Sequence, residues 1–232
     1  MSGNDQTYIQ ALALGLDPAW RRLSDAERHD DGCGFAEAHA AADLDGVRSI
    51  PYSSVGLEAG VDLLFWRMAP TVDALEASAA RLLRAGLGRW LTVRHSFIGR
   101  IGRIGPSQYV KKPTEQEQSL FDGERSRYLI VYPFTKSTDW YLQSREARQG
   151  IMNEHMRVGH DYPMVRQALA YSFGLDSQEF VVAYETDDLV AFGDLVRALR
   201  STDSRRSTVS DTPILLGIHR PLGEILSLLG AS

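Results

Sequence analysis

The chain has 232 residues, of which 44% are hydrophobic and 24% charged, with a formal net charge of −5 at pH 7. This composition is typical of globular proteins, and no run approaches the ~20 apolar residues of a membrane helix. The mild acidity disfavours nucleic-acid binding, which needs a concentrated basic surface. The single cysteine, Cys33, excludes an internal disulfide and a metal cage built from several cysteines. We therefore expect a cytoplasmic protein without a membrane span.

The first half of the chain predicts several strands and one clear helix. Residues 8–16 are mostly apolar and fit either a helix or a strand. Residues 20–43 are rich in Ala, Glu and Arg, but we expect Gly32 and Gly34 to interrupt any helix there. Apolar residues recur at helical spacing after Thr71, which predicts an amphipathic helix. Strands are predicted at 46–56, 61–68 and 90–98.

The second half of the chain begins with a predicted long connection at 99–127, which is rich in Gly, Pro and polar residues. After it, the hydrophobic pattern alternates between a period of two and a helical period. The predicted strands are 128–135, 167–173, 180–184 and 213–219. The predicted helices are 144–162, 187–199 and 222–229.

Two sections of the chain repeat the same pattern. Residues 61–86 and 180–203 each combine an apolar strand, a short turn and an amphipathic helix. A duplicated β-α-β-β-α-β unit fits this repetition. We therefore expect an α+β fold with two ferredoxin-like modules, 1–105 and 128–232, joined by a loop at 106–127. Their sheets would pack together or close into a barrel, with a crevice for an apolar ligand between sheet and helices.

One histidine stands out among the six in the chain. His155 lies on the apolar stripe of its predicted helix, with Met152 one turn before it and Gly159 one turn after it. Gly159 leaves room for a flat group, and a neutral imidazole on an apolar wall is what an iron porphyrin uses as an axial ligand. A histidine packed in the core is the alternative. His160 lies about 140° away around the helix, so the two histidines make a poor zinc site.

An aromatic cluster lies around the strand at 128–135. Tyr132, Phe134, Trp140 and Tyr141 gather in a short stretch, with Lys136 among them. Ordinary core packing explains such a cluster, and a surface lysine explains Lys136. Alternatively, the aromatic side chains form an oxidisable pocket and Lys136 pairs with a ligand carboxylate.

Taken together, these residues resemble the chlorite dismutase superfamily. YPFTK at 132–136 and DWY at 139–141 are similar to its Tyr-Pro-x-x-Lys/Arg and Trp-Tyr pattern. MNEH at 152–155 resembles the helix that carries its haem-ligand histidine, and YSFGLDSQEF at 171–180 resembles its strand–turn–strand. The likeness covers the second half of the chain, and the repeat pattern alone extends it to the first half.

The resemblance implies a fold, a cofactor and a set of roles. The fold is a dimeric α+β barrel of two ferredoxin-like modules, usually assembled as a homopentamer, with haem b or iron coproporphyrin III in the C-terminal module. It makes His155 the ligand of the haem iron. It makes Tyr132 the residue that forms a radical and attacks a porphyrin propionate, Lys136 the residue that holds a propionate, and Trp140 a pocket residue.

The residue on the other side of the porphyrin separates the branches of this superfamily. Chlorite dismutases have a catalytic arginine seven residues before the glycine of the Gly-Leu-Asp turn, and one group of coproheme decarboxylases has glutamine there. Here that position is Gln167, with Arg166 beside it. A shift of one residue exchanges the side chain that enters the pocket. Another group uses a histidine from the connecting loop, but no histidine lies between His95 and His155.

The leading hypothesis is a coproheme decarboxylase of haem biosynthesis that converts iron coproporphyrin III to haem b with hydrogen peroxide. Its catalytic residues would be Tyr132, Lys136 and Gln167, while His155, Trp140 and Arg166 would bind the cofactor. A chlorite dismutase acting through Arg166 or a peroxidase-like haem protein is the second hypothesis. A non-catalytic haem-binding relative is the third.

Overall fold

A computed structural model describes residues 7–101 and 123–231, which fall into two compact units. The first unit comprises the chain up to Arg100 together with the segment from Leu216 onward. The second unit extends from Ile101 to Leu215. No helix in the described part combines the length and apolarity needed to cross a membrane.

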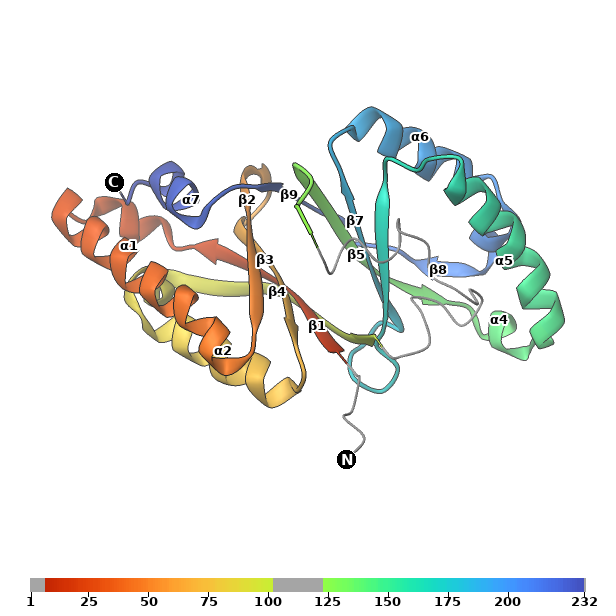
Figure 1. Cartoon of the computed structure of the whole chain (residues 1–232), viewed down its shortest axis with the longest axis horizontal. Coiled ribbons are helices and arrows are strands. Elements are labelled where there is room, and N and C mark those ends of the chain that lie inside the picture. The colour runs from red at the N-terminus through yellow and green to blue at the C-terminus, as the bar shows by residue number, and fades with distance from the viewer. Residues whose placement is uncertain (1–6, 102–122, 232) are drawn as a thin grey trace. The chain divides into compact units, whose positions relative to one another are not determined.

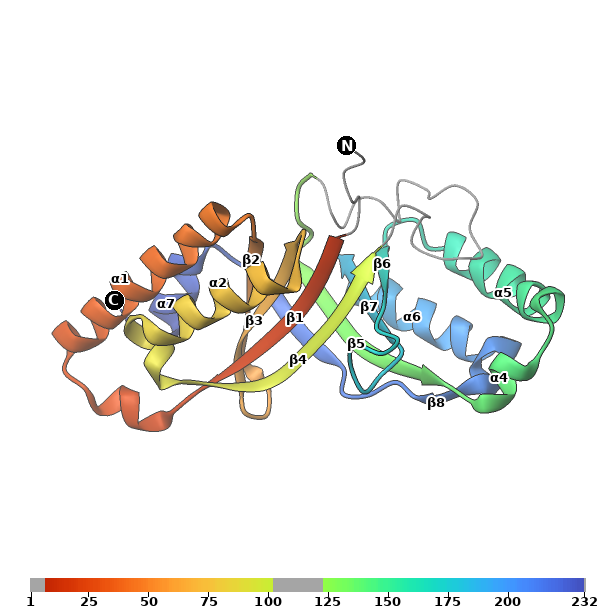
Figure 2. The same ribbon diagram turned by 90° about the horizontal axis from the view of Figure 1, so that it is seen from below.

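The first unit is an antiparallel sheet with helices on one face (Figures 1 and 2). Its strands follow the order β4-β1-β3-β2-β9. Its strands are β1 (Thr7–Leu16), β2 (Arg48–Glu58), β3 (Val61–Ala69), β4 (Leu91–Ile101) and β9 (Leu215–His219). Its helices are α1 (Asp25–Ala40), α2 (Val72–Arg84) and α7 (Leu222–Leu229), with short 3-10 turns at Pro18–Arg22, Ala41–Asp45 and Gly86–Trp90.

Helix α1 corrects one prediction from the sequence, because it runs unbroken through Gly32 and Gly34. Ser24 caps its N-terminus in a reciprocal capping box with Glu27, which satisfies free backbone donors of the first turn. The glycine at position 32 serves packing. A Cβ there would lie 2.8 Å from the Cβ of Ala231. The close approach of the C-terminal segment therefore explains this glycine better than a helix break does.

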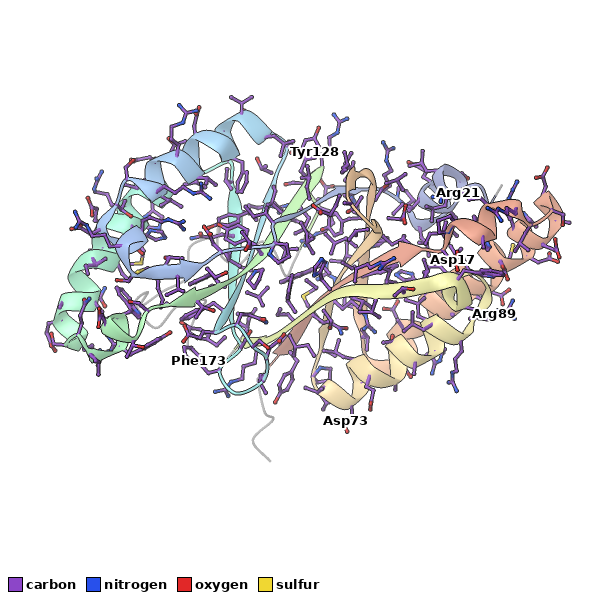
Figure 3. All side chains as sticks on the ribbon, turned by 180° about the vertical axis from the view of Figure 1, so that it is seen from behind. Asp17, Arg21, Asp73, Arg89, Tyr128 and Phe173 are labelled. Carbon is purple, nitrogen blue, oxygen red and sulfur yellow. The ribbon has the colours of Figure 1, made fainter. Side chains whose placement is uncertain are left out.

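The second unit is also an antiparallel sheet with two long helices, α5 and α6 (Figures 1 and 2). Its strand order is β6-β7-β5-β8. Figure 3 marks Tyr128 at the start of β5 and Phe173 in the turn after β6. The strands are β5 (Tyr128–Lys136), β6 (Arg166–Tyr171), β7 (Phe180–Thr186) and β8 (Thr208–Ser210). The helices are α4 (Thr138–Leu142), α5 (Arg145–His160) and α6 (Leu189–Arg200), with a 3-10 turn at Asp203–Ser207.

The two units repeat one arrangement of elements. Within each, a strand and a helix are followed by two strands, a helix and a strand, apart from the short α4 and the 3-10 turns. Residues 8–16 prove to be a strand, and the mixed α+β class predicted from the sequence is confirmed. The dimeric barrel predicted from the sequence is not confirmed. Residues 102–122, most of the predicted connection, lie outside the described residues.

The C-terminal segment differs from the expected module boundary at 128–232. Helix α7 packs with the first unit, where Ile225, Leu226 and Leu229 join its main hydrophobic cluster. In the same unit, Tyr52 and Ser53 of β2 pair with β9. The reason is apolar burial. Three large side chains of α7 move out of water when they pack into the core that α1, β1 and β3 form.

Candidate functional site

The second unit encloses a cavity of about 330 Å³ between its sheet and its two long helices. The lining is mostly apolar, with a few polar and charged groups, which is the usual make-up of a small-molecule site. Strands β5, β6 and β7 supply one wall and helices α5 and α6 the other. Lining residues used below are Tyr132, Lys136, Met152, His155, Met156, Gly159, Gln167, Val182, Tyr184, Phe192, Gly193, Arg200, Ser204, Arg205, Thr208 and Asp211.

Helix α5 is incompletely packed on the face that borders this cavity. None of its 16 residues is buried, although Met152, Met156 and Gly159 line the cavity. A Cβ added at Gly159, or at Gly193 of α6, would meet no atom within 4 Å. Protein interiors are normally close-packed. A long amphipathic helix beside empty space therefore indicates a binding cavity that a ligand fills.

His155 lies on this inner face of α5, as the sequence predicted. Its imidazole Nδ1 is buried and has no hydrogen-bond partner among the described residues. Burial, reinforced by the positive charge of Lys136, lowers the pKa of His155 to about 4. The ring is therefore neutral at pH 7 and can offer a nitrogen lone pair to a metal. An unpartnered buried polar atom is costly unless a ligand completes it.

Tyr132 lies on β5 and lines the cavity from the sheet side. Burial raises the pKa of Tyr132 well above its usual range, and neighbouring Tyr184 raises it further. The phenol is therefore protonated at all ordinary pH values. The structure brings Tyr132 and His155 to the same cavity from opposite walls, one on a strand and one on a helix.

Lys136 is buried at the end of β5, and its ammonium group is fully used within the protein. Its Nζ donates to the carbonyl oxygen of Ser204 at 2.9 Å, and to the hydroxyls of Ser204 and Thr208 at 3.1 Å each. It also lies 4.9 Å from the ring centre of Trp140. Burial lowers the pKa of Lys136 to about 8. A ligand carboxylate must therefore displace one of these bonds to bind Lys136.

Trp140 stands behind Lys136 and does not belong to the cavity lining. Its side chain is only 2% exposed and packs under the ammonium group. The sequence predicted that Trp140 contacts the cofactor directly. Trp140 contacts Lys136, which does line the cavity, and its predicted contact with the cofactor stays a prediction.

Strand β6 resolves the choice between Gln167 and Arg166. Successive side chains of a strand point to opposite faces, and Gln167 lines the cavity. Arg166 instead donates to the carboxylate of Glu185 at 2.7 Å and to the hydroxyl of Ser126 at 2.9 Å. Glu185 is fully buried, so this arginine neutralises a buried charge. The structure therefore places Arg166 outside the cavity lining, and its predicted cofactor contact stays a prediction.

The sequence analysis missed a charged edge of the cavity. Arg200 and Arg205 both line it, and both pair with Asp211, at 3.5 Å and 2.6 Å. Two guanidinium groups share one carboxylate, so the edge carries excess positive charge. Arginine binds carboxylates in a two-pronged geometry. The signal for Arg200 was the basic residues at the end of the helix, which are also the usual helix-dipole pattern and so did not single it out.

No group of three or more histidine, cysteine, aspartate or glutamate side chains within the described ranges could hold a bare metal ion. A single neutral histidine beside an apolar cavity does not make a zinc site. It matches the one-ligand attachment of an iron porphyrin, whose ring supplies the other donors. The donor set, the orphaned Nδ1 and the two open glycine positions thus fit a porphyrin.

Comparison with known proteins decides the family. The family model described as chlorite dismutase matches residues 27–220. The chain belongs to the chlorite dismutase family. The match extends beyond the cavity-bearing second unit and covers most of the first, where the sequence offered only a repeat pattern.

Two relatives illustrate the range of the family. The chain is 32% identical over 184 residues to the coproheme decarboxylase of Mycolicibacterium smegmatis, covering 77% of this chain and 75% of that protein. It also superposes on the chlorite dismutase of Candidatus Nitrospira defluvii in complex with imidazole. That match has a TM-score of 0.84 and 27% identity, and covers 99% of this chain and 97% of the other. The comparisons thus place both activities within the family.

Proposed function

We propose that this protein is a haem-binding enzyme of the chlorite dismutase family that decarboxylates iron coproporphyrin III to haem b with hydrogen peroxide. The observation that carries the proposal is one cavity lined by His155, Tyr132 and Gln167 together. The 32% identity to a coproheme decarboxylase supports the same reaction. Bound iron and peroxide supply the oxidising power in this reaction.

The chain's own residues then bind and orient the porphyrin. His155 offers a neutral nitrogen to the iron, because its pKa of about 4 keeps it deprotonated. The apolar side chains of α5 and β7 exclude water from the macrocycle. Arg200 and Arg205 hold propionates at the charged edge, since they are the cavity's accessible guanidinium groups.

Tyr132 is the reacting side chain of the proposal. Its phenol is protonated at rest and faces the cavity. In each decarboxylation a propionate loses carbon dioxide and becomes a vinyl group, giving up two electrons and a proton. Peroxide takes up these electrons and becomes water. Tyr132 relays them one at a time, with its phenolic Oη losing and regaining its proton.

A titration with mass detection tests this function. Purified protein with iron coproporphyrin III should give a ligated Soret spectrum, and hydrogen peroxide should then remove carboxyl groups from the porphyrin. Tyr132→Phe should keep the spectrum and lose the decarboxylation. Tyr128→Phe, on the same strand but outside the cavity lining, is the matched control. A ligated spectrum with unchanged porphyrin mass in the wild type would reject the enzyme and leave a haem-binding protein.

Chlorite dismutation through Arg166 is less well supported. The guanidinium of Arg166 is engaged with Glu185 on the face of β6 away from the cavity. Oxygen evolution from chlorite that disappears in Arg166→Ala would reverse this preference.

A further inference from the structure

Asp211 lies at the charged edge of the cavity and pairs with two arginines at once. Arg205 donates to Oδ2 of Asp211 at 2.6 Å, and Arg200 lies 3.5 Å from the same oxygen. The three side chains come from the end of α6, the 3-10 turn at Asp203–Ser207 and the residue after β8. All three line the cavity. A carboxylate of the protein itself therefore occupies both arginines in this structure.

This contact leaves hydrogen-bonding capacity on both guanidinium groups. Within the described ranges, Asp211 is their only side-chain partner, and it engages both through the single oxygen Oδ2. Arginine binds a carboxylate best with two parallel bonds to its two oxygens. Lys136 of the same cavity differs, because three hydrogen bonds already satisfy its ammonium group. The two arginines are thus the cations of this edge that can still gain from a ligand carboxylate.

The exposure of the edge makes the Asp211 contact selective. The side chains of Arg200 and Arg205 are 52% and 40% exposed, whereas that of Asp211 is 20% exposed. Two unpaired guanidinium groups at such an edge would attract small anions from solution. Asp211 is tethered beside them by the chain, so its effective concentration far exceeds that of a dissolved anion. A carboxylate on a ligand that fills the cavity is tethered in the same way and can therefore compete.

We propose that Asp211 is a specificity-determining residue: it excludes free anions from Arg200 and Arg205, which remain available only to a carboxylate on a ligand that fills the cavity. This inference rests on the proposed function in identifying that carboxylate as a porphyrin propionate. The same competition lowers the affinity for the porphyrin. A propionate at this edge either displaces Asp211 or binds beside its negative charge, and both cost free energy.

Free propionate tests the exclusion without any porphyrin. The ¹⁵N guanidinium signals of Arg205 are assigned by their loss in Arg205→Gln. Millimolar sodium propionate should leave these signals in place in the wild type and shift them saturably in Asp211→Asn. Asp194→Asn is the matched control, because Asp194 pairs with Arg197 on the surface of α6 at 3.2 Å, and it should behave as the wild type does. The same response in the wild type and in Asp211→Asn would overturn the proposal, whether or not the protein binds porphyrins.

Iron coproporphyrin III tests the competition within the cavity. Asp211→Asn should bind it about fivefold more tightly, as expected when one like charge is removed at a partly exposed site. The tetramethyl ester carries no free carboxylate and should bind equally to the wild type and to Asp211→Asn. In an Arg205→Gln background, the gain from Asp211→Asn should shrink. An undiminished gain there would overturn the proposal, because Asp211 would then only repel the ligand. Weaker binding in Asp211→Asn would overturn it as well, because Asp211 would then serve to position the arginines.

Asp211→Ala is the second variant and serves if Asp211→Asn does not fold. Asparagine keeps the shape of aspartate and one acceptor oxygen, whereas alanine removes the charge and the contact together. Both variants should admit free propionate and bind iron coproporphyrin III more tightly. Tighter binding in neither variant would contradict the proposal. A protein that shows this binding pattern without decarboxylating the porphyrin would retain the role of Asp211 and lose the proposed function.

Discussion

The first long helix of each unit has the same length and the same kind of cap, but only one of the two helices borders a cavity. Helices α1 and α5 each have 16 residues and begin after a serine cap. Ten residues after the first residue of α1 stands Phe35, and ten residues after that of α5 stands His155. Phe35 is fully buried in the core, whereas His155 faces a cavity. At the equivalent helix position, the first unit thus has a packed core side chain, whereas the second unit has a cavity. This cavity gives the second unit room to bind a ligand.

The largest expected effect is on the free energy of unfolding, when Phe35 and His155 are each replaced by alanine in separate variants. Phe35→Ala should lower the free energy of unfolding by about 3–5 kcal/mol, because it opens a hole in a filled core. His155→Ala in the ligand-free protein should change it by about 1 kcal/mol or less, since that side chain already borders empty space. Urea unfolding followed by circular dichroism measures both. Equal losses would mean that α5 is packed as tightly as α1.

Acid should destabilise the ligand-free second unit through His155. Its folded pKa of about 4 lies below the ordinary histidine pKa of 6.5, so the unfolded chain takes up a proton first as the pH falls. The stability is intact above pH 6.5 and declines toward pH 4, by up to about 3 kcal/mol. His39 in the first unit shifts in the same direction. The test is therefore the stability of wild type minus that of His155→Gln, which should fall by up to about 3 kcal/mol from neutral pH to pH 4, so that the variant becomes the more stable protein in acid.

A ligand that fills the cavity should raise the stability of the protein, because it supplies the packing contacts that the empty cavity lacks. Iron coproporphyrin III at a hundredfold excess over its Kd should stabilise the protein by about 2.7 kcal/mol. Thermal melting read by the fluorescence of Trp140, the tryptophan of the second unit, reports this gain. The other tryptophans should be replaced by phenylalanine for the measurement. His155→Ala should abolish the gain, and a gain that survives this substitution would place the iron ligand elsewhere.

The smallest expected effect concerns the charged edge. Arg200→Gln should weaken binding of iron coproporphyrin III about twofold to fivefold, because its side chain is half exposed and such pairs are worth about 0.5–1 kcal/mol. Arg197→Gln on the same helix is the matched control, since Arg197 pairs with Asp194 at the surface. The difference should vanish in high salt. Equal effects of the two substitutions would remove Arg200 from the site.

The strands and helices were largely predictable because burial imposes its period on the sequence. The last helix, for example, was expected at 222–229 and forms over those residues. What it packs against was not predictable, since an apolar stripe fits any core. The break expected at Gly32 was wrong for the same reason: a glycine can serve a close contact as well as a bend.

Within the site, a residue in a local helical pattern was easier to predict than the face of a strand on which a side chain lies. His155 was identified from the apolar residues one turn away, and the helix places it as expected. Neighbouring Gln167 and Arg166 could not be separated, because a shift of one residue reverses a strand's faces. Tyr184 was missed although it follows Val182 by two residues on a strand, and both line the cavity. The alternation was visible in the sequence, but the identity of the face was not.

The packing of α7 makes the second unit an insertion in the polypeptide. The chain leaves the first unit near Arg100 and re-enters it at Leu216. A stop codon after residue 215 would therefore spare every residue that lines the cavity and still remove Ile225, Leu226 and Leu229 from the core of the first unit. Loss of residues 216–232 would reach the proposed porphyrin chemistry only through the folding of the first unit.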